Sequence, residues 1–252
     1  RAVGNSRMPL VFLVLSACLN VVLDLILIIN FKMGVAGAAW ATNLSQAISA
    51  VLCAVYIYKK VPALMPEKRH WRFHKGDTRY QLATGIPMAL QFAITSSGTM
   101  VMQSAINLFG SEAVAAYTAA GKIHGLLTQG MVAMGQTMAV YSGQNYGKGD
   151  AGRIRQGVRA ALIIEVIYSV ASAVVVSAAL GPSLGLFFSG EVDLAAMMPW
   201  ARTYTTICTL FYVPLCTIFI FRNTMQGCGY GFLPMMGGVS ELFARLIVAV
   251  IA

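Results

Sequence analysis

Seven apolar segments, each long enough to cross a lipid bilayer, decide what this chain can fold into. A helix needs about 20 predominantly apolar residues to span the hydrocarbon core of a membrane. Every backbone N–H and C=O group in that core has to be hydrogen-bonded within the protein, so we expect each segment to be a helix. The predicted spans are 9–30, 34–58, 81–108, 113–142, 153–180, 194–222 and 232 to the end of the chain.

The composition supports this prediction. The chain has 252 residues, of which 58% are hydrophobic and 11% are charged, whereas a soluble domain carries about 25% charged residues. The predicted fold is therefore an all-α, polytopic transmembrane helix bundle. The chain starts at Arg1 rather than at a methionine, and it ends inside an apolar segment. We expect it to be a piece of a longer protein.

Lysine and arginine residues gather in every second loop, which sets the orientation. The positive-inside rule places these loops in the cytoplasm, so the first span begins on the cytoplasmic side. The net charge of +9 thus reflects membrane topology rather than a nucleic-acid surface. The longest basic loop, 59–79, is predicted to be a cytoplasmic linker between segments 1–58 and 80–252. Contact with lipid headgroups is the alternative role for this linker.

The first span carries Asn20 and Asp24 among its apolar residues. Their spacing of four places both side chains on one face of a helix. An ionisable group at membrane depth costs roughly 3 kcal/mol or more and marks a functional site by default. We expect Asp24 to bind a proton or Na⁺. The alternative is an aspartate that only forms hydrogen bonds between helices.

Further charged and neutral polar groups lie inside the spans. Glu165 either lines a cavity or carries a proton, or it is a structural partner of Lys122. Glu241 and Arg245 are four residues apart and predict an ion pair that neutralises itself, with substrate contact as the alternative. The neutral polar side chains either line a water-filled cavity or bond neighbouring helices, and they include Gln46 and Gln91.

The spans contain no arrangement of residues that is typical of an enzyme. There is no Ser/His/Asp set and no zinc-binding HExxH motif, and the three histidines are scattered. We therefore predict no catalytic residue, no cofactor and no metal centre beyond a possible Na⁺ site.

Several motifs follow one another in a fixed order: RAVGNSRMPL, GVAGAAWAT, GSEAVAAYTAAGKI, YSGQNYGKGDAGRIRQG, and QGCGYGFLP followed by SELFAR. Over nearly the whole chain this series resembles the multidrug and toxic compound extrusion (MATE) family. The resemblance implies a twelve-helix protein with two six-helix lobes, of which this chain holds helices five to eleven. Residues 1–58 are then the last two helices of the N-terminal lobe, and 80–252 are a C-terminal lobe lacking its last helix.

The resemblance also implies a function. Family members are multi-pass plasma-membrane proteins that export drug-like, often cationic, compounds in exchange for Na⁺ or H⁺ by alternating access. They need no cofactor, and we expect the full-length protein to be a monomer in the bilayer. Two rival functions from other classes are a flippase for lipid-linked oligosaccharides and a seven-helix receptor or sensor. A flippase would need a cationic cavity, for which Lys122 and Arg202 are the candidates.

The cation site of one branch of the family maps onto three residues here. In the DinF-like branch the site uses an aspartate of the first helix, an Asn and an Asp of the fifth, and a Thr of the sixth. By motif the latter three fall on Asn20, Asp24 and Thr42. The NorM-like branch uses a glutamate of the seventh helix, but that position is Thr95 here and segment 81–108 contains no acid. This departure favours the DinF-like branch.

Overall fold

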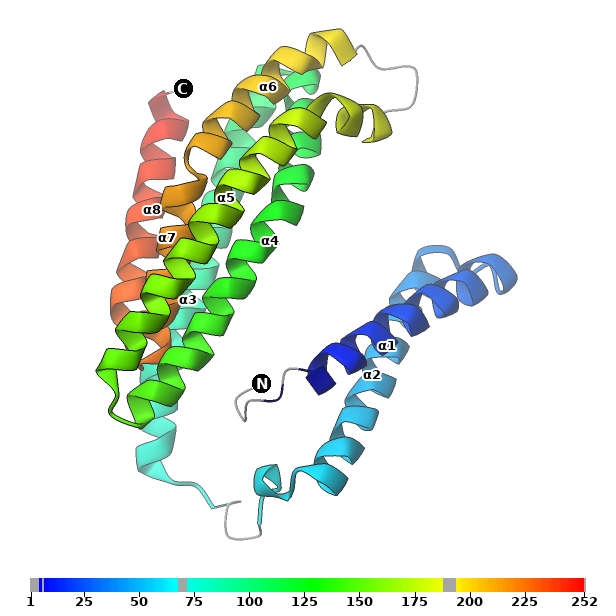
Figure 1. Ribbon diagram of the computed structural model, residues 1–252. Helices are drawn as coiled ribbons and strands as arrows, with labels where there is room; N and C mark the ends of the chain where they lie inside the picture. The colour runs from blue at the N-terminus through cyan, green and yellow to red at the C-terminus, as the bar shows by residue number, and fades with distance from the viewer. Residues whose placement is uncertain (1–4, 6, 68–71, 188–193, 252) are drawn as a thin grey trace. The chain divides into compact units, whose positions relative to one another are not determined.

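Helices make up the regular structure of this protein. The computed structural model describes residues 5, 7–67, 72–187 and 194–251, and these residues contain no strand. Contacts between residues divide the chain into two compact units, Arg1–Lys75 and Gly76–Ala252, each with its own packed helices (Figure 1).

The first unit is a pair of packed helices. Helix α1 (Arg7–Asp24) continues into a six-residue π-helix (Leu25–Asn30), and a tight turn leads into α2 (Gly34–Lys60). The predicted spans 9–30 and 34–58 lie within these elements, but the π-helix was not predicted. Its sequence, LILIIN, is almost entirely aliphatic. Such a run has no polar face from which a helical period can be read.

Gly37 lets α2 approach the π-helix closely. A Cβ atom at Gly37 would lie 3.2 Å from both the carbonyl carbon and the carbonyl oxygen of Leu27. That carbonyl oxygen accepts a hydrogen bond from the Met33 N–H at 3.1 Å, and the Phe31 N–H donates to Ile26 at 3.1 Å. The π-helix and the turn that follows it are thus held in place by backbone hydrogen bonds and by tight packing on α2.

In the described residues, the second unit contains six α-helices. Helices α4, α5, α6 and α7 pack against one another, and α3 and α8 also belong to this unit (Figure 1). Their bounds are α3 (Lys75–Ile106), α4 (Ser111–Gly147), α5 (Ala151–Phe187), α6 (Leu194–Leu210), α7 (Tyr212–Gly227) and α8 (Phe232–Ile251). In the predicted linker, α2 ends at Lys60 and a 3₁₀ turn covers Pro62–Leu64; residues 68–71 lie outside the described residues.

Three clusters of buried apolar side chains form the core of the second unit. The first contains Ala116, Ala119, Ala120, Leu180, Leu184, Met197 and Ala201. The second contains Met131, Tyr212 and Cys216, and the third contains Met138, Ala161 and Ile220. All three draw on α4 together with α5, α6 or α7, so these four helices are held together along the bundle.

The predicted span 194–222 is broken into two helices. Helices α6 and α7 meet at Phe211 with a bend of 49°. Pro214 explains the break, because its ring has no N–H to bond the carbonyl of Leu210 and would clash with that carbonyl in a continuous helix. The Phe211 N–H donates instead to the Cys208 carbonyl oxygen at 3.1 Å, which closes α6 with a tighter turn.

Not every predicted span is equally apolar. Within the described residues, four helical segments are long and apolar enough to cross a membrane, and a fifth is added when α6 and α7 count as one bent span. Helices α3 and α4 have 32 and 37 residues, but they contain more Ser, Thr, Gln and Gly than the four apolar segments do. All seven predicted spans therefore correspond to helices, two of which are more polar than a typical span.

Candidate functional site

Asn20 and Thr42 bring α1 and α2 together through a polar contact. The Asn20 Nδ2 atom donates to Thr42 Oγ1 at 3.4 Å, which is long for a hydrogen bond. The Thr42 hydroxyl donates in turn to the Ala38 carbonyl oxygen at 3.0 Å. This leaves the amide oxygen of Asn20 and a lone pair on Thr42 Oγ1 as hard oxygen ligands for a small cation.

Asp24 lies one turn further along α1, where α1 changes into the π-helix. Its side chain is half-buried, and its Oδ1 atom is buried without a hydrogen-bond partner among the described residues. A buried carboxylate oxygen is costly unless a donor or a cation satisfies it. Asp24 thus lies one turn from Asn20 along α1, and Asn20 in turn contacts Thr42 on α2.

A groove of about 580 Å³ runs between α1 and α2. Asn20, Thr42 and the exposed side chain of Gln46 are among its lining residues, whereas Asp24 is not. Asp24 therefore lies one turn beyond the part of α1 that lines the groove.

Glu165 on α5 is buried in the second unit. Its side chain is 3% exposed, and its Oε2 atom has no hydrogen-bond partner in the described part of the chain. Ala161, one turn before it, belongs to the third apolar cluster, and Tyr168 packs against the second cluster. The carboxyl group therefore lies between two apolar layers.

Lys122 lies at a different level of the bundle from Glu165. Its side chain is exposed, and the neighbouring Ile123 packs on the first cluster, which includes Leu180. Glu165 precedes Leu180 by about 15 residues of helix, or about 22 Å. The structure therefore does not bring Lys122 to Glu165.

His124 is a site residue that sequence reasoning missed. Its Nδ1 atom lies 2.5 Å from the hydroxyl of Tyr212, and its ring is 6% exposed. Its Nε2 atom is buried without a partner in the described residues, and the Tyr204 ring packs edge-on at 5.4 Å. Since Tyr212 is the first residue of α7, this bond ties α4 to the bend between α6 and α7.

Gln91 on α3 forms polar contacts with α7. Its side chain is 4% exposed. In the amide orientation that places its oxygen on the guanidinium, Gln91 Oε1 accepts from Arg222 Nε at 3.3 Å and Nη1 at 3.2 Å. Its nitrogen then lies 2.8 Å from Gln226 Nε2, and it donates to Gln226 when that amide is turned so that its oxygen faces Gln91. Thr95, one turn further along α3, is half-buried, and the backbone of Gly238 on α8 packs near both residues.

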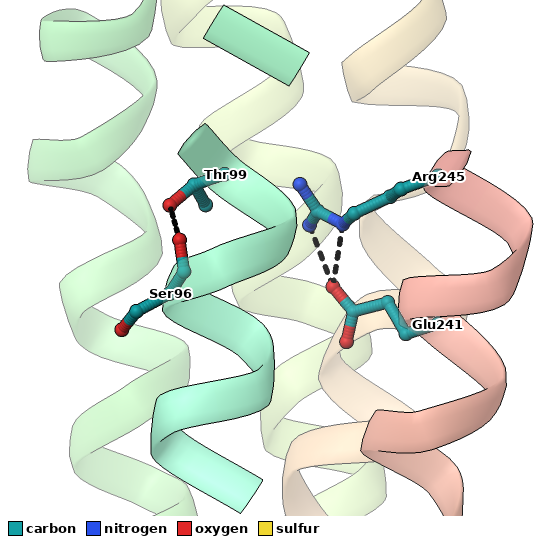
Figure 2. Close-up of polar contacts among 4 residues, drawn as sticks. All are labelled: Ser96, Thr99, Glu241 and Arg245. Carbon is teal, nitrogen blue, oxygen red and sulfur yellow. Dashed lines mark hydrogen bonds and ion pairs between the residues drawn. The ribbon is translucent and has the colours of Figure 1, made fainter. Parts of the chain in front are cut away.

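Glu241 and Arg245 form the ion pair that their spacing suggests. Arg245 Nε and Nη2 both donate to Glu241 Oε1, at 3.1 and 2.6 Å (Figure 2). The Arg245 side chain faces α3, because a Cβ atom at Gly98 would lie 2.8 Å from Arg245 Cδ. The side chains are 32% and 40% exposed for Arg245 and Glu241.

Comparison with solved structures identifies the fold. The structure is similar to an outward-facing multidrug resistance MATE family transporter of the MOP superfamily, with a TM-score of 0.81 and 22% identity over 91% of this chain and 51% of that one. It is also similar to a mutant of the Vibrio cholerae MATE transporter VcmN, with a TM-score of 0.83 and 20% identity over 96% and 54% of the two chains.

Sequence comparison gives the family. Over 156 residues the chain is 33% identical to the probable multidrug resistance protein YpnP of Bacillus subtilis, covering 61% of this chain and 34% of that protein. It is 25% identical over 261 residues to the probable multidrug resistance protein NorM of Thermotoga maritima, covering 99% and 54%. The chain thus spans about half or less of the length of these relatives. The family model named MatE matches residues 87–251. The chain therefore belongs to the MATE family of membrane transporters, as the motifs predict, and not to a family of enzymes.

Proposed function

We propose that this chain is part of an exporter that couples the entry of a cation at Asp24 to the release of drug-like organic molecules. Its relatives are named as multidrug resistance and multidrug export proteins, which supports the transported class. The observation that carries the coupling role is the buried, unpartnered Oδ1 atom of Asp24, one turn from the contact between Asn20 and Thr42.

The coupling ion binds where these oxygens converge. Carboxylate, amide and hydroxyl oxygens suit Na⁺, and the carboxylate alone suits a proton. A ligand shifts a conformational equilibrium only by its difference in affinity for the two states. The junction between α1 and the π-helix is the element we expect to change, because π-turns inside helices are frequent at functional sites.

Three features favour the DinF-like arrangement of the site. Asn20, Asp24 and Thr42 occupy neighbouring positions of α1 and α2, Thr95 takes the place of the α3 acid, and α3 beyond its first turn contains no acid. In this proposal, 1–58 contribute the last helices of an N-terminal lobe and 80–252 contribute most of a C-terminal lobe. The protein then works as a monomer in the plasma membrane.

Glu165 is our candidate for a second proton-carrying group. The other acid within a predicted span of the second unit, Glu241, is paired with Arg245. Glu165 lies between apolar clusters with its Oε2 unpartnered, so its neutral acid form is the one this environment favours. Proton exchange there would add pH dependence to transport without contributing to the Na⁺ site.

The test is ethidium efflux by the full-length protein in proteoliposomes, driven in turn by a Na⁺ gradient and by a pH gradient. We expect Asp24→Asn to lower the rate about tenfold or more and to abolish its dependence on the driving ion. Thr42→Val should only weaken the apparent affinity for Na⁺. Asp77→Asn, the same change at an exposed position at the start of α3, is the matched control. Wild-type rates with unchanged ion dependence in Asp24→Asn would reject the coupling role.

A further inference from the structure

Two sets of polar contacts lie in the second unit: Gln91 on α3 with Arg222 and Gln226 on α7, and Glu241 with Arg245 on α8. The Gln226 amide on α7 contacts Gln91 on α3, and the Gln91 oxygen accepts hydrogen bonds from Arg222 on α7. The Arg222 guanidinium also lies within the electrostatic influence of Glu241 on α8. Glu241 then pairs with Arg245. All five residues lie within helices that were predicted to span the membrane or at their cytoplasmic ends.

The charges of this cluster of five residues do not balance. The cluster has two guanidinium groups and one carboxylate, and that carboxylate accepts from both Nε and Nη2 of Arg245. The close partners of Arg222 are neutral: the amide oxygen of Gln91 at 3.2 and 3.3 Å and the ring of Phe219, whose centroid is 5.0 Å away. Arg222 is half-buried, and a partly buried cation whose contacts in the described residues are neutral is costly, which makes it a candidate site for an anion.

We propose that this cluster, defined as Gln91, Arg222, Gln226, Glu241 and Arg245, binds one carboxylate group of an organic anion. A guanidinium has five N–H donors in a planar fork that matches a carboxylate. Gln91 occupies the Nε and Nη1 edge of Arg222, which fixes the plane of the fork and leaves its Nη2 side for the ligand. The Gln226 amide supplies a further neutral donor beside it.

Glu241 sets how strongly the cluster attracts an anion. Its single negative charge offsets one of the two positive charges, so the cluster carries an excess of one. Removing this charge without changing the side-chain shape increases the attraction, whereas removing the charge of Arg222 abolishes the excess. The two changes thus have opposite signs, which a simple loss of folding cannot imitate.

This proposal rests on the proposed function in one respect, because it takes the bound anion to be a transported compound. Binding itself is measured at equilibrium, without an ion gradient and without transport. Asp24→Asn leaves the cluster intact, so a failure of the coupling proposal and a failure of this one give different results.

The experiment compares the affinities of two isosteric probes, 2-naphthoate and neutral 2-naphthamide, for the full-length protein in phosphatidylcholine nanodiscs by titration calorimetry. We expect the wild type to bind naphthoate about tenfold or more tightly than naphthamide, as charge-assisted hydrogen bonds imply. Arg222→Gln should reduce this preference to about one, and Glu241→Gln should increase it severalfold.

Arg202→Gln is the matched control, because it removes the same charge from an exposed position on α6, and it should keep the wild-type preference. Equal affinities of the two probes for the wild type, an unchanged preference in Arg222→Gln, or a lowered one in Glu241→Gln would each overturn the proposal. Nanodiscs with added phosphatidylglycerol test whether a lipid phosphate is the natural occupant. If this lipid competes with naphthoate, and if Arg222→Gln abolishes that competition, the assignment to soluble cargo is overturned.

Discussion

Gly227, the last residue of α7, is the position where a single methyl group should do the most damage. A Cβ atom there would lie 2.2 Å from the carbonyl oxygen of Ala139, 2.9 Å from its carbonyl carbon and 3.0 Å from its Cα. All three atoms belong to the backbone of α4, so no side chain can turn away. The contact is mutual, because a Cβ atom at Gly143 would lie 3.1 Å from the Gly227 carbonyl oxygen.

The cost of Gly227→Ala follows from this geometry. Comfortable contacts between non-bonded heavy atoms begin near 3.5 Å, so α4 and α7 have to separate by roughly 1 Å. Overpacking of this kind costs about 1–3 kcal/mol, and the higher helix propensity of Ala offsets at most about 1 kcal/mol. A net loss of about 1–2 kcal/mol lowers the melting temperature by about 2–8 °C for a chain of this size.

The assay is thermal unfolding in detergent with a thiol-reactive fluorescent dye, which reports the exposure of the buried Cys216 thiol. Gly125→Ala is the control on α4, because nothing lies within 4 Å of a Cβ atom at that position. We expect this control to melt at or slightly above the wild-type temperature. A Gly227→Ala protein as stable as Gly125→Ala would refute the claim that the two backbones touch.

Three further predictions concern polar groups. Tyr212→Phe leaves the buried His124 ring without its partner and should lower stability by about 1–3 kcal/mol, measured in the same thermal assay. Glu165→Gln should keep stability within about 0.5 kcal/mol, because an amide resembles the neutral acid that we assign to this site; a loss of several kcal/mol would instead indicate a buried ion pair. Outside the spans, the hydrogen bond with Tyr230 raises the pKa of Tyr146 above its usual 10, so Tyr230→Phe should let Tyr146 ionise at lower pH in an ultraviolet titration.

The helices of this protein could be predicted from the sequence because their signal is local. An apolar run of about 20 residues is visible without any tertiary information. Each predicted span falls on helical residues, and one of them, 194–222, falls on the two helices α6 and α7. The π-turn after Asp24 and the break at Phe211 were not predicted. The first depends on tight packing against Gly37, and the second on Pro214, whose effect on a membrane helix ranges from a mild kink to a complete break.

The polar contacts also fall into two groups, those that the sequence predicts and those that it does not. Glu241 and Arg245 are four residues apart, so their pairing follows from helix geometry alone. The contacts of Gln91 with Arg222, and of His124 with Tyr212, join residues of different helices that are far apart in the sequence. No spacing rule indicates such pairs, and only the packing of α3 and α4 against α7 brings them together.

The π-helix after Asp24 has a consequence for the gene. A π-turn holds one more residue than the α-turn it replaces, so it behaves as a single-residue insertion in α1. Deleting one codon between Leu25 and Asn30 would restore regular α geometry but rotate Asp24 by about 100° relative to α2. Exchanges among aliphatic residues in this stretch should therefore be harmless, whereas a one-codon deletion should inactivate the protein while leaving every residue before Leu25 unchanged.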